Sequence, residues 1–232
     1  MSVIVRTILT AIIAYLLGSM SFAVIFTRGH MNRDIRDLGS GNAGFTNVLR
    51  SVGVVPAVLT ILFDFLKGVV AVLIGWWIFS GVQGDPSVTM HEYASYGRYL
   101  AGVCAIIGHS YPVFFGFRGG KGVTTAAAMM SVVDIRVFLA IISTFLIIFA
   151  CTRIVSLASL ACAALYPVYT CVITYFGSYL PLLGTPDALR LRYVFLVTLA
   201  SAAVGVFVII KHTDNIRRLV RGEEKVLKIK KD

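Results

Sequence analysis

Long apolar runs separated by short polar segments dominate the chain. The runs cover Val3–Thr27, Val54–Phe79, Tyr99–Phe117, Val155–Phe176 and Tyr193–Ile210. Each has about the 20 residues that a helix needs to cross a bilayer. A polar stretch, Gln83–Ser95, and a loop with Pro and Gly, Gly177–Arg192, lie between neighbouring runs. The pattern predicts an all-α integral membrane protein; for the first run, a cleaved signal peptide is the alternative.

A sixth apolar stretch, residues 123–150, is interrupted by Asp134 and Arg136. A single helix would hold both charges at mid-membrane, at a cost of about 2.5–3.5 kcal/mol each. Two helices that meet near residue 134 place these charges at an interface instead. The fourth span, Val123–Val133, is then short, because 11 residues rise only about 17 Å in a helix.

The distribution of the positive charges favours seven transmembrane helices over six. Cytoplasmic loops of membrane proteins carry an excess of Lys and Arg. With seven spans, the N-terminus outside and the C-terminus cytoplasmic, 15 of the 21 Lys and Arg residues lie on the cytoplasmic side and 5 outside, with Lys67 inside a span. Six spans would place the basic tail opposite the other basic loops. We therefore expect one polytopic domain over residues 1–232.

The composition excludes several classes of protein. The chain is 58% hydrophobic and only 14% charged, with a net charge of +10, whereas soluble domains are about 25% charged. A soluble enzyme, a secreted disulfide scaffold and a disordered protein are thereby excluded. The cations are divided among inner loops, so we expect no nucleic-acid partner. The four cysteines have no metal-ligand spacing, and we expect neither a metal nor a cofactor.

The predicted topology gathers three unusual polar segments on the cytoplasmic side. The first, residues 38–47, is rich in Gly and Asn and is followed by Arg50. Backbone N–H groups of such a loop at a helix start form an anion site. Arg50 lies one helical turn after Asn47, which puts the two on one face. A flexible loop between helices is the alternative, and composition does not decide between them.

The second segment ends in Gly119-Gly120-Lys121-Gly122 just before a helix. Backbone donors and the Lys charge there suit a phosphate. The segment is not a Walker A loop, because Phe115 and Gly122 replace its first Gly and its Ser or Thr. His109, at the end of the preceding apolar run, is either a hydrogen-bonded structural residue or a base.

The third segment follows the last apolar run. His212 and Asn215 are three residues apart, so they share a helix face if the last span continues inward. A basic tail attracted to anionic lipid is the alternative, and it explains Lys225–Lys231 but not this pair. Within the second run, Asp64 and Lys67 have the same spacing and are either a functional group or a structural ion pair.

The three segments together resemble the bacterial integral-membrane acylphosphate:glycerol-3-phosphate acyltransferases, the PlsY family. The matching residues are Gly39-Ser40-Gly41-Asn42, Thr46-Asn47 and Arg50; Gly108-His109, Pro112 and Gly119-Gly120-Lys121-Gly122-Val123; and His212, Asn215-Ile216, Arg218-Leu219, Gly222 and Glu224. Asp64, Lys67-Gly68 and Ser156-Leu157-Ala158-Ser159 also fit. The likeness covers essentially the whole chain in order. Phe45, where the family usually has Ala, is a departure.

The resemblance implies transfer of a fatty acyl group from acyl phosphate to the sn-1 hydroxyl of glycerol 3-phosphate, at the cytoplasmic face of the bacterial inner membrane. The products would be lysophosphatidic acid and phosphate. Acyl-CoA and acyl carrier protein would not be donors. The sequence agrees with this, because no His is followed by Asp five residues later, the arrangement usual in membrane acyltransferases that use thioesters.

Both expected substrates carry phosphate, so the site needs cations and N–H donors more than a base. The expected catalytic residues are Ser40, Arg50, Lys121, His212 and Asn215. The expected substrate-binding residues are Gly39, Gly41, Asn42, Thr46, Asn47, His109, Gly119, Gly120, Gly122, Arg218 and Glu224. We hypothesise that Ser40, Arg50, Lys121 and glycine N–H groups hold the phosphates, while His212 and Asn215 orient the glycerol hydroxyl or the acyl carbonyl.

Three other functions are alternatives to this one. A transporter of phosphate-bearing anions predicts binding residues at mid-membrane and an internal repeat, neither of which the sequence shows. A lipid scaffold accounts for the basic tail but not for the Gly- and Asn-rich loops. A different lipid-group transferase would use the same segments on another substrate.

Overall fold

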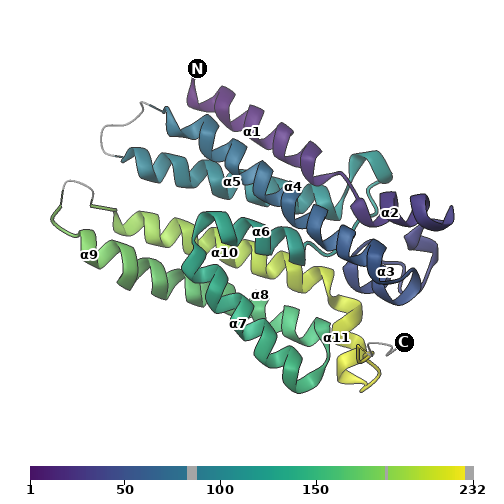
Figure 1. Ribbon diagram of the computed structural model, residues 1–232. Coiled ribbons are helices and arrows are strands. Elements are labelled where there is room, and N and C mark those ends of the chain that lie inside the picture. Colours follow the sequence, from purple (N-terminus) through teal and green to yellow (C-terminus); the bar gives the residue numbers. More distant parts are fainter. Residues whose placement is uncertain (83–87, 186–187, 228–232) are drawn as a thin grey trace. The chain divides into compact units, whose positions relative to one another are not determined.

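The apolar runs become helices at nearly the expected places. The computed structural model describes residues 1–82, 88–185 and 188–227, and all regular secondary structure in these ranges is helical (Figure 1). The helices form two compact units, Met1–Val133 and Asp134–Asp232. The single domain expected over residues 1–232 stays a prediction, and each unit is described by itself.

Unit 1 is built on three long helices that pack side by side. The elements of this unit are α1 (Val3–Gly18), α2 (Phe22–Met31), η1 (Ile35–Asp37), α3 (Phe45–Ser51), α4 (Val54–Ser80), α5 (Met90–Ser110), η2 (Val113–Phe115) and α6 (Val123–Val133). Helix α4 packs against α1, α5 and α6, and α1 also packs against α5. The predicted polar segments between α2 and α4 and between α5 and α6 belong to this unit.

Unit 2 is a set of antiparallel helices with a short terminal helix. Its elements are α7 (Ile135–Thr152), α8 (Val155–Thr174), a π-helical turn η3 (Tyr175–Tyr179), α9 (Leu180–Leu182), α10 (Leu191–Lys211) and α11 (Thr213–Val220). Helix α8 packs against both α7 and α10. The third predicted polar segment lies in α11 and the residues around it.

The break predicted near residue 134 is confirmed. Helix α6 ends at Val133 and α7 begins at Ile135, with Asp134 between them. The Asp134 carboxylate caps α7 by accepting the Arg136 N–H at 2.9 Å, and it forms an ion pair with the Arg136 guanidinium at 2.7 Å. A capping carboxylate satisfies an N–H group that the helix itself leaves unpaired.

Several predicted boundaries are wrong. The first run is divided at Ser19–Ser21 into α1 and α2. Helix α5 begins at Met90, inside the expected polar stretch, because Thr89 caps it by accepting the Glu92 N–H at 3.1 Å. It also ends at Ser110 rather than at residue 117, and α8 continues through η3 and α9 into the loop expected from Gly177. Residues 83–87 and 186–187 of the two expected loops lie outside the described residues.

Helices long and apolar enough to cross a membrane make the protein an integral, multi-pass type. In the described part of the chain five stretches qualify: Val3–Met31, Val54–Ser80, Ile135–Thr152, Val155–Leu182 and Leu191–Lys211; Val123–Val133 is apolar but shorter. Large apolar side chains point outward on them, such as Trp77, 73% exposed, and Phe195, 65% exposed. Lipid, rather than protein, suits such faces. Seven spans and their orientation stay a prediction.

Glycines let the helices of unit 1 approach closely. A Cβ added at Gly75 in α4 would lie 2.4 Å from the Gly97 carbonyl oxygen in α5, and one added at Gly97 would lie 2.5 Å from the Gly75 carbonyl oxygen. Gly18 in α1 meets the Ala105 carbonyl of α5 in the same way, at 2.2 Å. Small residues at such crossings are typical of membrane helices, whose association depends on close van der Waals packing.

In unit 2, a glycine allows close helix packing beside a proline. Pro167 lies inside α8 and has no N–H to donate to the Ala163 carbonyl one turn earlier. Gly205 of α10 lies at that carbonyl, where an added Cβ would be 2.4 Å from its oxygen. The glycine thus allows α10 to pack at the point where α8 lacks a hydrogen bond.

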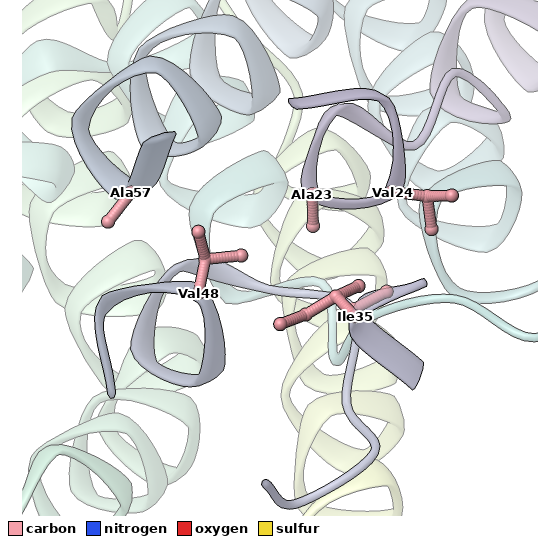
Figure 2. Close-up of a cluster of buried hydrophobic side chains, with 6 residues drawn as sticks. Ala23, Val24, Ile35, Val48 and Ala57 are labelled. Carbon is pink, nitrogen blue, oxygen red and sulfur yellow. The ribbon is translucent and has the colours of Figure 1, made fainter. Parts of the chain in front are cut away.

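A small apolar cluster supports the first polar segment in unit 1. Its buried members come from α2, η1, α3, α4 and the connecting loop: Ala23, Val24, Ile35, Ala43, Val48 and Ala57. Figure 2 shows these side chains converging from separate elements. Phe45 also packs against the cluster, so this departure from the family pattern contributes to the core beneath the loop.

Candidate active site

Asn47 organises the first loop from within. Its amide nitrogen lies 2.9 Å from the Leu38 carbonyl oxygen and 3.0 Å from that of Asn42. Its side-chain oxygen accepts the Ser40 backbone N–H at 3.0 Å. The residue is 4% exposed. A buried amide whose donors and acceptor are all bonded to the loop backbone determines the loop's shape. Asn47 therefore positions the loop.

Glycines permit this close wrapping around Asn47. Gly39 and Gly41 have left-handed backbones, with φ of +56° and +70°, a region that glycine enters without a Cβ penalty. A Cβ at Gly39 would also lie 2.3 Å from the Asn47 side-chain oxygen. Ser40, whose backbone N–H is bonded to Asn47, is exposed at the surface of the loop.

The backbone N–H groups of these loops are mostly used internally. Gly41 donates to the Leu38 carbonyl at 2.9 Å and Gly44 to the Asn42 carbonyl at 3.1 Å. In the second loop, Gly120 donates to the His109 carbonyl at 3.1 Å, and Gly119 donates to the Ser110 carbonyl at 3.3 Å. This differs from our expectation that glycine N–H groups would be open to an anion. These glycines therefore shape the loops through hydrogen bonds within unit 1.

The second loop turns back over the end of α5. A Cβ at Gly119 would lie 2.0 Å from the His109 carbonyl oxygen, so this turn needs a residue without a side chain. Gly122, with φ of +84°, leads into α6. Lys121, between them, is partly buried. His109 itself lies beneath the loop, 6% exposed, rather than at its surface.

The first and second loops lie against one another within unit 1. A Cβ at Gly120 would be 2.7 Å from the carbonyl oxygen of Ala43 in the first loop. Arg36, in η1, donates to the carbonyls of Phe115 and Arg118 in the second loop. The fold thus joins two segments that are more than 70 residues apart in the sequence.

Arg36 is itself held by an acid that sequence reasoning did not include. Asp34 accepts from the Arg36 guanidinium at 2.8–2.9 Å and from Arg28 at 2.8 Å. The hydrogen bonds from Arg36, assisted by Arg28, outweigh burial and hold the pKa of Asp34 well below its usual range. In the sequence, Asp34 is only an acid two residues from an Arg, before a Gly-rich loop. This arrangement is too common to identify Asp34 as a site residue.

In unit 2, Glu224 connects the residues of the third segment. Its Oε1 accepts from Asn215 Nδ2 at 2.6 Å and from Ser156 Oγ at 2.7 Å, and its Oε2 accepts from Arg218 Nε at 2.6 Å. Burial raises the pKa of Glu224, but the hydrogen bonds from Arg218, Ser156 and Asn215 outweigh it and leave the pKa below its usual value. Glu224 therefore stays ionised and holds its three partners.

Ser156 was missed as a site residue, although its segment was noticed. It lies in the first turn of α8 and reaches the same carboxylate as Asn215. Its sequence signals are a polar residue at the start of an apolar span and a place in a segment that fits the family pattern. Leu227, whose N–H donates to the Arg153 carbonyl at 2.9 Å, also ties the tail to this end of the unit.

His212 lies at a break between helices rather than within one. Helix α10 ends at Lys211 and α11 begins at Thr213, so the last span does not simply continue inward. Nδ1 of His212 is 2.8 Å from the Val208 carbonyl oxygen, which makes Nδ1 the donor and Nε2 the acceptor in the neutral ring. His212 and Asn215 are both buried, at 3% and 6% exposed.

The remaining predicted residues follow their loops. Arg50 is exposed near the end of α3, Thr46 and Asn42 are partly buried, and Gly122 is buried. Unit 1 therefore brings together the residues of the first two segments, and unit 2 brings together those of the third.

Helices of membrane-spanning length and buried polar loops define a multi-pass integral membrane protein. Within that class, the family model described as "Glycerol-3-phosphate acyltransferase" matches residues 8–222. The chain belongs to the glycerol-3-phosphate acyltransferase family.

Curated relatives agree along nearly the whole chain. A glycerol-3-phosphate acyltransferase of Halalkalibacterium halodurans is 38% identical over 221 residues, covering 94% of both chains. One from Thermoanaerobacter sp. (strain X514) is 34% identical over 220 residues, covering 95% of both. One from Thiobacillus denitrificans is 37% identical over 217 residues, covering 94% of this chain and 95% of the relative.

Solved structures show the same likeness. The crystal structure of PlsY, an integral membrane glycerol 3-phosphate acyltransferase, in its glycerol 3-phosphate form has a TM-score of 0.73 and 32% identity, and covers 96% of each chain. Its lysophosphatidic acid form has a TM-score of 0.73 and 31% identity, covering 96% of this chain and 95% of that one. The resemblance inferred from the sequence motifs is confirmed.

Proposed function

We propose that this protein transfers a fatty acyl group from acyl phosphate to the sn-1 hydroxyl of glycerol 3-phosphate. The hydroxyl oxygen attacks the acyl carbonyl carbon, the bond from that carbon to the phosphate oxygen breaks, and lysophosphatidic acid and phosphate leave. The observation that carries the proposal is the contact of two Gly-rich loops in unit 1, in a chain of the glycerol-3-phosphate acyltransferase family. PlsY has been crystallised in forms with glycerol 3-phosphate and with lysophosphatidic acid, the acceptor and product of this reaction.

Side chains of unit 1 hold the phosphates in this proposal. Ser40 and Arg50 are exposed on the first loop and on α3, and Lys121 follows the glycines of the second loop. An Arg guanidinium and a Lys ammonium form charge-assisted hydrogen bonds with phosphate oxygens. As the acyl–phosphate bond breaks, negative charge grows on the departing phosphate, and these cations stabilise it.

His212 and Asn215 of unit 2 orient the glycerol hydroxyl or the acyl carbonyl. With Nδ1 committed to Val208, the neutral His212 ring offers Nε2 as an acceptor, which suits a hydroxyl proton. The Asn215 side chain is fixed by Glu224. The hydroxyl proton passes finally to a phosphate oxygen of the donor, so positioning supplies most of the rate.

The donor and the location are part of the same proposal. An acyl phosphate has a good leaving group and needs no strong base, and the chain lacks the His and Asp spacing usual for thioester donors. The active site lies at the cytoplasmic face of the bacterial inner membrane, where the basic segments are expected.

Purified protein with glycerol 3-phosphate and a choice of donors tests the proposal. Palmitoyl phosphate should give one lysophosphatidic acid for each phosphate released, and palmitoyl-CoA should give none. Turnover with palmitoyl-CoA alone would overturn the donor assignment. Movement of glycerol 3-phosphate into vesicles without acyl transfer would favour the transporter.

A further inference from the structure

Unit 1 contains a buried cluster of ionisable side chains to which the proposed function assigns no role. Asp64 and Lys67 lie on α4, and His109 lies in the last turn of α5. They are 2%, 5% and 6% exposed. Asp64 and Lys67 form an ion pair, one of the two alternatives that their spacing left open, with 2.6 Å between Oδ1 and Nζ. An ion pair buried among membrane helices is costly to keep, which makes a specific role worth seeking.

Three acceptors surround the Lys67 ammonium. Besides Asp64 Oδ1, Nζ lies 2.6 Å from the Met20 carbonyl oxygen and 3.1 Å from His109 Nδ1. An ammonium has three hydrogens and no lone pair. Nζ is thus within hydrogen-bond distance of the Met20 carbonyl and of His109 Nδ1, with Asp64 as its ion-pair partner.

This contact fixes the proton of the His109 ring. Because Lys67 donates, Nδ1 accepts, and the neutral ring carries its proton on Nε2. Asp64 Oδ1 is farther from Nδ1, at 3.7 Å, so Lys67 at 3.1 Å is the nearer partner of that ring atom. A carboxylate, an ammonium and a neutral imidazole together carry no net charge, and a neutral group is the cheapest to bury.

Nε2 of His109 lies where the two Gly-rich loops meet. A Cβ added at Gly120 would be 2.2 Å from Nε2 and 2.7 Å from the Ala43 carbonyl oxygen. The His109 carbonyl also accepts the Gly120 N–H at 3.1 Å. The ring and its own backbone thus both contact the second loop, next to the first.

We propose that Asp64, Lys67 and His109 form a buried group that fixes the position of the two phosphate-binding loops against each other. Asp64 neutralises and orients Lys67, Lys67 fixes the tautomer of His109, and His109 supports Gly120 and hence Lys121. His109 is then a positioning residue, not a group that touches substrate. The inference rests on the proposed function, because it assumes that these loops bind phosphate.

The tautomer is measured directly by NMR on the full chain in detergent with ¹⁵N-labelled histidine. The chain has only four histidines, and a His109→Gln variant assigns the signal of interest. We expect a neutral ring with the proton on Nε2. A proton on Nδ1, or a charged ring, would overturn the inference without any variant being needed.

The function of the group is tested with the double variant Asp64→Asn/Lys67→Met. Removing both charges avoids the buried, unpaired charge that either single change would leave, so this variant should fold. We expect the fixed tautomer to be lost, the KM for glycerol 3-phosphate to rise about tenfold, and binding of inorganic phosphate to weaken by a similar factor, the size of effect that outer positioning partners have elsewhere.

Thr60→Val is the matched control. Thr60 is buried on α4 about one turn before Asp64, and its hydroxyl donates to the Pro56 carbonyl of its own helix at 2.7 Å. This variant should change neither the tautomer nor the KM. A double variant that folds and keeps the wild-type tautomer and KM would refute the positioning role. Wild-type protein that binds phosphate and has the expected tautomer, yet transfers no acyl group, would refute the proposed function instead.

Discussion

At the scale of single residues, two polar side chains, one buried and one partly buried, hold their surroundings in place. Asn47 organises the first loop in unit 1, and Glu224 connects Asn215, Arg218 and Ser156 in unit 2. Both are surrounded by residues that match the family pattern in the sequence. The geometry divides the marked residues into those that reach outward, such as Ser40, and those that support them.

Glu224→Gln should lower stability in a pH-dependent way. The lowered pKa of Glu224 means that its contribution is complete above the ordinary value of 4.5 and is lost as the pH falls through the folded value. At pH 7 we expect a loss of about 1–3 kcal/mol, because hydrogen bonds to a charge are weakened. Thermal unfolding in detergent at pH 7 and at pH 3.5 should show the gap between variant and wild type narrowing at the lower pH. An unchanged gap would contradict the assignment.

Lys121→Ala should abolish acyl transfer while the protein still folds. Loss of a preorganised charge at a developing anion costs on the order of 100-fold or more in turnover. Lys121→Arg is the matched control, since it keeps the charge with a different shape and should retain part of the activity. Near-normal activity of the alanine variant would remove Lys121 from the phosphate site.

At the scale of helices, close crossings depend on glycine. The α4–α5 contact at Gly75 and Gly97 leaves no room for even one methyl group. Both helices also carry the buried group formed by Asp64, Lys67 and His109. A shift of one helix against the other would therefore reach the loops as well as the core.

Gly75→Ala should destabilise unit 1, because its Cβ would meet backbone rather than a movable side chain. Overpacking of this kind costs about 1–3 kcal/mol. Gly29→Ala is the control: it lies inside α2 with nothing within 4 Å of its Cβ position, so it should be neutral or stabilising by up to about 1 kcal/mol. Melting temperatures in one detergent compare the two, and equal values would argue against the close crossing.

At the scale of the whole molecule, the topology is the open prediction. Seven spans place the two ends of the chain on opposite sides of the membrane, with the basic tail inside. A fluorescent-protein fusion after Asp232 should therefore fluoresce in the cytoplasm, while a tag before Met1 should be accessible from outside. Accessibility of both ends from the same side would require an even number of spans.

The sequence was informative where the physics is local. Hydropathy predicted the bounds of α4, α6 and α10 to within two residues, and the cost of a charge in lipid predicted the break at Asp134. It failed at the start of α5 and the end of α8, because a Thr cap and a π-helical turn extend helices into polar sequence. A cap or a π-helical turn changes the stability of a helix end only slightly. Neither depends on hydropathy, so hydropathy does not predict these ends.

The sequence by itself therefore determined the class, the family and the segments in which we expect the chemistry. Tertiary structure decided which partners each residue in those segments contacts. That Asn47 faces inward, that glycine N–H groups bond to carbonyls, and that Lys67 meets His109 across 42 positions depend on contacts between distant parts of the chain. Local patterns set which residues enter the membrane, whereas hydrogen-bond partners are chosen only when helices pack.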